Sequence, residues 1–140
     1  MTPLPLSAEE VERLADAYVA HYANPVIWDE NNVLLRRDSS ATEWAKERIM
    51  DITDDTPEAL WDIVLAVLRR NPPVEVIEIL AAGPLEDFLA RCGETVIEQV
   101  EYQAEREPRF RSLLGGVWQN RMSDEVWARV CACRDTSEWY

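Results

Sequence analysis

Apolar side chains recur at helical spacing along most of this chain. In residues 7–23 they follow one another at intervals of three and four, which is the pattern of an amphipathic helix. Ser7 stands three residues before Glu10, the arrangement of a capping box at a helix N-terminus. Residues 57–70 are apolar almost all round, and such a helix packs against neighbours on several sides. We therefore predict that residues 57–70 form a central helix.

Prolines and glycines interrupt this pattern at short intervals. A proline at the first helical position and a glycine just past the last are typical helix boundaries. Such boundaries fall at Pro25, Pro72, Gly83–Pro84, Gly93, Pro108 and Gly115–Gly116. Short loops between short helices favour antiparallel packing. The predicted fold is all-α, a single domain over residues 1–140, built as a compact bundle of about eight short helices or as a short solenoid-like stack of helical hairpins.

Two segments have a less regular pattern. In residues 25–38 two short apolar runs flank a polar group, which fits an irregular loop or a small hairpin, and we favour the loop. Residues 136–140 form a tail that ends in Trp139 and Tyr140. These two aromatic side chains either fold back onto the domain or are presented to a partner, since neither suits idle exposure to water.

The composition is that of an ordinary globular protein with a strong acidic excess. Hydrophobic residues make up 47% of the 140 residues, and 27 acidic residues against 14 basic ones give a net charge of −13. This charge repels nucleic-acid phosphates and anionic lipids, and it favours encounter with a basic protein, unless it serves solubility alone. No signal-peptide pattern or apolar membrane span occurs, and the cysteines number three. We expect a cytoplasmic protein with reduced thiols that binds neither nucleic acid directly nor membranes.

The residue types that carry common enzyme and metal chemistry are poorly placed. His21 is the only histidine, and Lys46 is the only lysine. Cys131 and Cys133 diverge on a predicted helix, which is poor geometry for chelation, and a structural zinc site needs about four ligands. No glycine-rich phosphate loop occurs, and paired carboxylates stand at predicted helix N-termini, where acids stabilise the helix. We expect no metal, no cofactor and no enzymatic activity.

One set of acidic residues is ordered along a predicted helix. It consists of Glu94, Glu98, Glu101 and Glu105, which follow one another at intervals of three or four residues. Like charges one turn apart slightly destabilise their own helix, so a basic partner would relieve a cost. We call these four residues the glutamate stripe. They are either a solvated face or the contact surface for an arginine- or lysine-rich protein.

The stretch LLGGVWQNRMSDEVW, residues 113–127, joins two predicted helices. Gly115–Gly116 permits a sharp exit from the first helix, because glycine tolerates positive φ. Its candidate binding residues are Trp118, Gln119, Asn120 and Arg121. In one interpretation the tryptophan fills a gap and the amides satisfy backbone groups near the next helix cap. In the other it is a recognition loop, because tryptophan and arginine are enriched in binding hot spots.

Three segments carry a resemblance to a known family. They read AAGPLED (Ala81–Asp87), GGVWQNRM (Gly115–Met122) and SDEVWARV (Ser123–Val130). From about Trp61 to Val130 the chain resembles a family of small bacterial proteins that is classed as a domain of unknown function. The resemblance implies an all-helical bacterial domain, and it transfers no activity and no catalytic residue.

These observations favour a non-enzymatic acidic module that binds a basic protein, in the manner of an immunity or inhibitor protein acting on a toxin. The glutamate stripe would steer the partner, and Trp118, Arg121 or the tail would anchor it. Two alternatives stay open. One is a helical scaffold or regulatory subunit that self-associates, and the other is an acidic mimic of nucleic acid that inhibits a DNA-binding enzyme.

Overall fold

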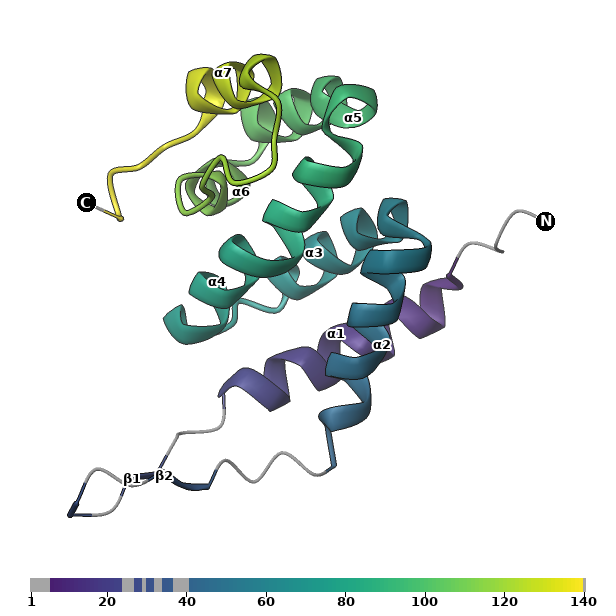
Figure 1. Cartoon of the computed structure of the whole chain (residues 1–140), viewed down its shortest axis with the longest axis vertical. Coiled ribbons are helices and arrows are strands. Elements are labelled where there is room, and N and C mark those ends of the chain that lie inside the picture. Colours follow the sequence, from purple (N-terminus) through teal and green to yellow (C-terminus); the bar gives the residue numbers. More distant parts are fainter. Residues whose placement is uncertain (1–5, 24–26, 29, 32–33, 37–40, 140) are drawn as a thin grey trace.

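The computed structural model describes residues 6–23, 27–28, 30–31, 34–36 and 41–139, and it is all-helical apart from one pair of very short strands (Figure 1). The helices of the first half are α1 (Ala8–Ala23), α2 (Glu43–Asp55) and α3 (Leu60–Arg69), the last preceded by the 3₁₀ turn η1 (Pro57–Ala59). Those of the second half are α4 (Val74–Leu80), the π-helical turn η2 (Ala81–Leu85), α5 (Glu86–Arg106), α6 (Pro108–Leu114) and α7 (Asp124–Cys133). The all-α prediction is confirmed.

Two helices begin at a serine whose side chain holds a capping hydrogen bond. The Ser7 hydroxyl accepts a hydrogen bond from the Glu10 backbone N–H at 3.1 Å, as the capping box predicts. The Ser123 hydroxyl accepts from the Val126 N–H at 3.2 Å and so starts α7. Local sequence therefore determines where these two helices begin.

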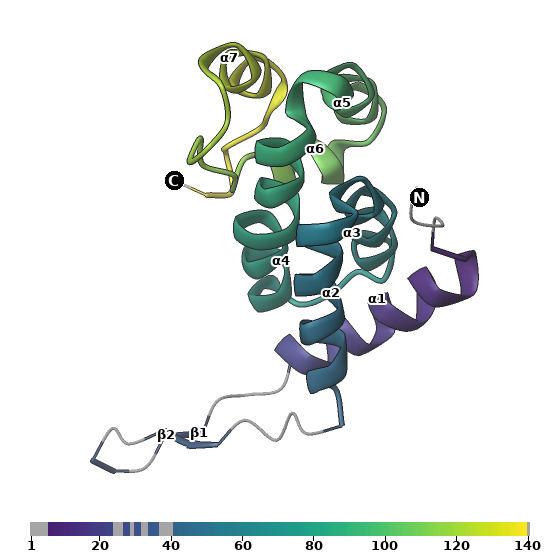
Figure 2. The ribbon, with the colours of Figure 1, turned by 45° about the vertical axis from the view of Figure 1, so that its right-hand side comes forward.

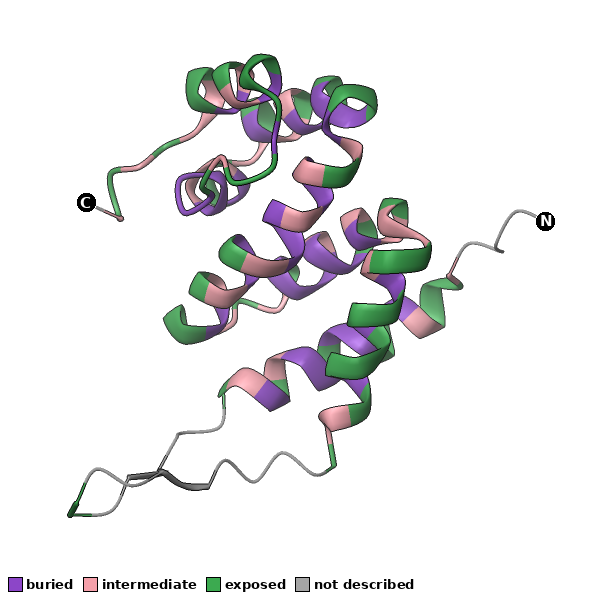
Figure 3. Ribbon diagram, viewed as in Figure 1, coloured by how far each residue is buried: buried purple, intermediate pink, exposed green. Residues whose placement is uncertain are grey.

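Helix α3 is central, as its apolar pattern predicts. Six of its ten residues are buried, namely Leu60, Ile63, Val64, Ala66, Val67 and Leu68. They belong to one cluster of buried apolar side chains to which every α-helix contributes. In two views, α1 and α2 lie toward one end of the molecule and α5, α6 and α7 gather at the other, with α3 and α4 between them (Figures 1 and 2). Buried residues concentrate where these helices face one another (Figure 3).

The prediction of about eight helices is wrong, because the described residues form six continuous helical stretches. The chain stays helical from Val74 to Arg106, straight through two predicted boundaries. Pro84 lies inside η2, where the wider π turn accommodates a residue that lacks a backbone N–H. Gly93 lies inside α5, against Val126 of α7: a Cβ atom on Gly93 would lie 2.9 Å from Val126 Cγ1. Glycine is there for close helix packing and does not end the helix.

The irregular segment contains a hairpin pairing, so the preference for a loop is wrong. Strands β1 (Ile27–Trp28) and β2 (Leu34–Arg36) pair antiparallel, with Ile27 opposite Arg36 and Trp28 opposite Leu34. The register shifts between the two pairs, as at a β-bulge. Across the residues that the structure describes, no helix is both long and apolar enough to cross a membrane.

Candidate functional site

A buried carboxylate joins the start of α5 to the loop between α6 and α7. Glu86 is only 7% exposed, and its side chain points to residues 115–123, which we call the α6–α7 loop. Its Oε2 accepts the backbone N–H of Trp118 at 3.2 Å, and its Oε1 accepts the side-chain amide of Asn120 at 2.9 Å. Each oxygen of this buried carboxylate therefore accepts a hydrogen bond, as buried polar groups require. These two hydrogen bonds hold the α6–α7 loop against the start of α5.

Gln119 and Asn120 also contribute to the shape of this loop. Gln119 donates its amide to the backbone carbonyl of Met122 at 3.2 Å and to the Asp124 carboxylate at 2.8 Å. Asn120 adopts a left-handed backbone with φ 45°, which asparagine tolerates better than most residues. Gln119 thus satisfies a backbone group beside the α7 cap, as one interpretation of the sequence proposed. Asn120 instead bonds to Glu86.

The outward side of the loop carries an exposed tryptophan and an exposed arginine. The Trp118 side chain is 62% exposed, the largest exposed fraction among the large hydrophobic residues that the structure describes. Arg121, three residues on, is also exposed. Trp118 therefore does not fill a gap between helices. Its backbone is held by Glu86 and its indole ring projects from the loop.

Gly115 and Gly116 serve a different purpose from the predicted one. Neither has positive φ, so the sharp exit does not depend on that freedom. A Cβ atom on Gly115 would collide with the backbone oxygen of Asp135, and one on Gly116 would collide with the indole of Trp139. The glycines therefore leave room for residues 134–139, which pass directly over them.

Trp139 acts as a latch on this surface. Its indole N–H donates to the Ser112 carbonyl at 2.7 Å, and its side chain is partly buried against the core. The Asp135 N–H donates to the Arg111 carbonyl at 3.0 Å, and the Ser112 hydroxyl donates to Glu138 at 3.3 Å. Of the two interpretations of the tail, folding back describes Trp139, and Tyr140 lies outside the described residues.

The glutamate stripe lies along the side of α5 that borders α7, and it is partly balanced. Glu94, Glu98 and Glu105 are exposed, whereas Glu101 forms a two-pronged ion pair with Arg129 of α7. The hydrogen bonds that Arg129 donates to Glu101, and after them the charges of Glu101 and its acidic neighbours, raise the pKa of Arg129. The chain's own arginine therefore relieves part of the repulsion along the stripe, at its third residue.

The sequence comparison now decides the family. A family model described as a family of unknown function, DUF6869, matches residues 34–138. The chain belongs to the DUF6869 family. The match begins well before Trp61, where the sequence resemblance was expected to start. No curated protein and no solved structure matches the chain significantly.

Two of the three segments that carried the resemblance to a family of unknown function meet in space at Glu86. Glu86 belongs to the segment Ala81–Asp87, and its two partners belong to Gly115–Met122. Sequence reasoning missed Glu86, because a predicted helix boundary at Gly83–Pro84 made it an ordinary acid of a helix N-terminus. The available signal was its setting, an acidic pair between the apolar residues Leu85 and Phe88.

Three further titratable groups of the second half have shifted pKa values. Burial raises the pKa of Asp87, while the charges of Arg91 and Arg121 act to lower it. Burial also raises the pKa of the Cys92 and Cys133 thiols, which keeps them protonated and weakly nucleophilic at neutral pH. Within the described part of the chain, no three His, Cys, Asp or Glu side chains are grouped so as to hold a metal ion.

Proposed function

We propose that this DUF6869 protein is a non-enzymatic, acidic protein-binding module that occludes a basic partner, in the manner of an immunity or inhibitor protein acting on a toxin. One observation carries the proposal: an exposed tryptophan stands on a loop whose backbone is fixed by a buried carboxylate. Binding costs least when the contacting group is already ordered, because little conformational entropy remains to be lost. Tryptophan and arginine are the residue types that dominate binding hot spots, and the exposed Arg121 follows three residues after Trp118.

Charge supplies the second part of the proposal. The net charge is −13, and exposed Glu94, Glu98 and Glu105 line α5 next to α7. Helix α7 links the two features, since it follows the α6–α7 loop and its Arg129 bonds to Glu101. Complementary charge accelerates encounter and selects partners of the opposite sign. The stripe would then steer a basic protein and Trp118 would anchor it.

Affinity capture from cells of the source organism tests the proposal with matched variants. Trp118→Ala removes the proposed anchor, and Trp44→Ala removes another exposed tryptophan, 37% exposed on α2. We expect a basic protein that is retained by the wild type and by Trp44→Ala and lost with Trp118→Ala. With that partner purified, calorimetry should show at least about a thirtyfold weaker affinity for Trp118→Ala, the loss typical of a hot spot.

The charge contribution has its own measurement. Replacing Glu94 and Glu98 together by glutamine should slow association and flatten its dependence on salt, while dissociation changes little. Stopped-flow kinetics with the purified partner separates the two rates. A partner whose capture is indifferent to Trp118, or an acidic one, would contradict the proposal. A concentration-dependent dimer in sedimentation that disappears with Trp118→Ala would assign the same surface to self-association instead.

A further inference from the structure

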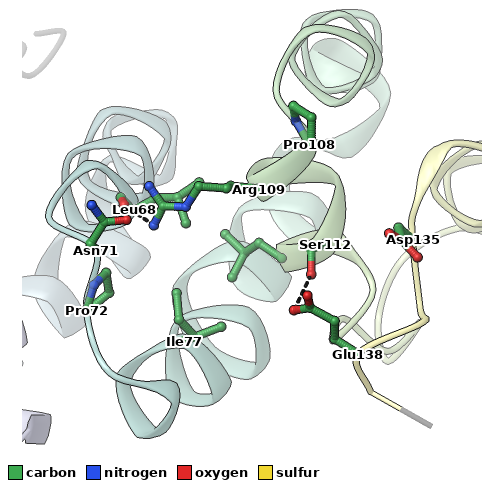
Figure 4. A pocket seen from close by; sticks show the side chains of 10 residues that line it. Leu68, Asn71, Pro72, Ile77, Pro108, Arg109, Ser112, Asp135 and Glu138 are labelled. Atoms are coloured by element: carbon green, nitrogen blue, oxygen red, sulfur yellow. Dashed lines mark hydrogen bonds between the residues drawn. The ribbon is translucent and has the colours of Figure 1, made fainter.

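A cavity of about 360 Å³ lies between α3, α4, α6 and the chain segment after α7 (Figure 4). This volume lies within the range of small-molecule and side-chain binding pockets, roughly 300–1,000 Å³. Its apolar lining includes Leu68, Ile77 and Leu113 from the three helices, together with Pro72 and Pro108. We call it the tail pocket, because residues 135 and 138 of the tail form one of its walls.

That wall carries two carboxylates held in place by the tail. Glu138 accepts a hydrogen bond from the Ser112 hydroxyl at 3.3 Å, and the two are drawn facing each other in Figure 4. Asp135 accepts the Ser137 backbone N–H at 2.9 Å, and this bond lowers the pKa of the Asp135 carboxyl, so the group is ionised at neutral pH. The Trp139 latch anchors the same segment to Ser112. The negative charges are therefore built into an ordered wall.

The opposite wall carries one arginine whose charge is already engaged. Arg109 Nη2 donates to the Leu68 carbonyl at 2.8 Å, near the C-terminus of α3. Carbonyls at a helix C-terminus carry the negative end of the helix dipole, which offsets part of the guanidinium charge. Among the residues that line the pocket, two carboxylates face one engaged arginine, which is a negative excess, and the charge of Arg111 also reaches Asp135 from outside the lining. An apolar floor with a negative wall is complementary to an alkyl chain that ends in a cation.

We propose that the tail pocket receives the side chain of a lysine or arginine from the basic partner, with its alkyl stem over Leu113 and Ile77 and its cationic head at Glu138 and Asp135. This inference rests on the proposed function and names where that partner inserts. The long stem of a basic side chain buries apolar surface while its charge meets the carboxylates. The two residue types differ in geometry, since a guanidinium can bond to a carboxylate as a planar fork and an ammonium acts as a point charge.

Small probe molecules test the pocket without the partner. The isotope-labelled full chain is titrated with n-butylguanidinium, n-butylammonium and, as the neutral control, 1-butanol. The Trp139 indole N–H resonance reports on the pocket wall, because its acceptor is Ser112. We expect saturable shifts at Trp139, Ser112 and Leu113 with the cations, at dissociation constants on the order of millimolar for such small probes, and much weaker shifts with 1-butanol. Tighter binding of the guanidinium would assign the pocket to arginine, and the reverse to lysine.

Charge-neutral variants make the test specific. Asp135→Asn combined with Glu138→Gln keeps the acceptor oxygens and removes both charges, so binding of the cations should weaken at least about tenfold. Glu47→Gln changes an exposed glutamate of α2 that neither lines the pocket nor belongs to the glutamate stripe, and it should leave the titration unchanged. An unaltered spectrum outside the pocket confirms that the double variant is folded. Equal shifts with 1-butanol, or cation binding that survives in the double variant, would overturn the inference.

The partner experiment separates this inference from the function on which it rests. Capture that depends on Trp118 but is indifferent to the Asp135→Asn/Glu138→Gln variant overturns the pocket assignment and leaves the proposed function standing. Capture of no basic partner, together with specific cation binding in the pocket, rejects the proposed function and supports the ligand class assigned to the pocket. Loss of capture in both variants supports both.

Discussion

Glu86 places a carboxylate under the α6–α7 loop, with one oxygen for the Trp118 N–H and the other for Asn120. Removing it deprives the Trp118 N–H and the Asn120 amide of a buried acceptor, and the loss of a buried hydrogen-bond partner costs about 1–3 kcal/mol. We therefore expect Glu86→Ala to lower the free energy of unfolding by about that amount, measured by urea denaturation. Hydrogen exchange at the Trp118 amide should accelerate by more than this global change accounts for.

Glu86→Gln is the matched control for that prediction. Glutamine has the same shape and retains one oxygen, so it can accept from one of the two donors only. Its loss of stability should lie between those of the wild type and Glu86→Ala. Unchanged exchange at Trp118 in the alanine variant would show that the loop is held by other contacts.

Gly115 and Gly116, which lie under the tail, have close neighbours, whereas Gly83 has open space around it. A methyl group on Gly116 would occupy the position of the Trp139 indole, whereas nothing lies within 4 Å of a Cβ atom on Gly83. We expect Gly116→Ala to displace the latch and destabilise the fold by about 1–3 kcal/mol, the usual cost of overpacking. Tryptophan fluorescence and urea denaturation measure both effects, and the indole N–H bond to Ser112 should be lost.

Gly83→Ala serves as its control. Alanine is favoured over glycine inside helices by about 1 kcal/mol, so this variant should be neutral or more stable than the wild type. Equal destabilisation by both substitutions would mean that backbone effects, and not the indole contact, explain the Gly116 result.

At the scale of the helices, the sequence predicts what local chemistry decides. Ser7 and Ser123 cap helices because their hydroxyls reach N–H groups three residues away, and the apolar stripe of α3 predicts its central place. Gly93 could not be interpreted correctly from its own neighbours, because the reason for it is Val126, which lies in a different helix. Likewise η2 absorbs Pro84 through a π turn that no local pattern announces.

The candidate site also combines residues that the local sequence predicts with residues that it does not. Trp118 and Arg121 could be proposed from residue type alone, and both are exposed. Glu86 could not, because its role depends on a loop that lies about thirty residues further along the chain. The tail pocket was also beyond prediction, since Asp135 and Glu138 meet Leu68 and Ile77 only after the tail folds back over α6. These features depend on contacts between residues far apart in the chain, and such contacts cannot be inferred from a single sequence.

The packing of α7 on α5 gives a prediction at this scale. Gly93→Ala gains helix propensity of about 1 kcal/mol but brings a methyl group to 2.9 Å from Val126 Cγ1. Because overpacking costs about 1–3 kcal/mol, we expect a net loss of stability in the wild-type background. In a Val126→Ala background the obstructing methyl groups are gone, and the same substitution should become stabilising. Urea denaturation of the four proteins of this double-mutant cycle measures the coupling.

If the change in stability of the double variant equals the sum of the two single changes, the close approach of Gly93 and Val126 is contradicted. The Glu101–Arg129 ion pair provides an internal comparison, because it also joins α5 to α7 but lies outside this contact. Glu101→Gln should therefore add to Gly93→Ala without coupling to it beyond a few tenths of a kcal/mol.

For the molecule as a whole, the acidic surface is interrupted by ion pairs that tie helices together. Arg70, at the end of α3, bonds to Glu12 and to Asp16 of α1, each at 2.6 Å. The same guanidinium donates to the backbone carbonyls of Ala66 and Glu12. With a net charge of −13, protonation of carboxylates at low pH has two opposite effects: it relieves the general repulsion, and it breaks such pairs.

A comparison of two glutamine variants isolates the second effect. The hydrogen bond from Arg70, and then its charge, lower the pKa of Glu12 below its ordinary value of 4.5. A folded-state pKa below the unfolded one stabilises the protein at pH values above about 4.5, and this stabilisation is lost as the pH falls through the folded pKa. Glu12→Gln should therefore be less stable than Glu9→Gln near neutral pH. Glu9 is an exposed glutamate of α1 for which the described residues provide no ion pair, and both variants change the net charge equally.

The difference between these two variants, measured by urea denaturation across a pH series, should stay constant from neutral pH down to about 4.5 and then shrink toward zero. The relief of overall repulsion acts on both proteins alike and cancels in the difference. A difference that persists unchanged well below the ordinary pKa of glutamate would mean that the contribution of Glu12 is packing of its stem and not its charge. The ion pairs would then play no part in the acid response of the fold, and repulsion alone would govern it.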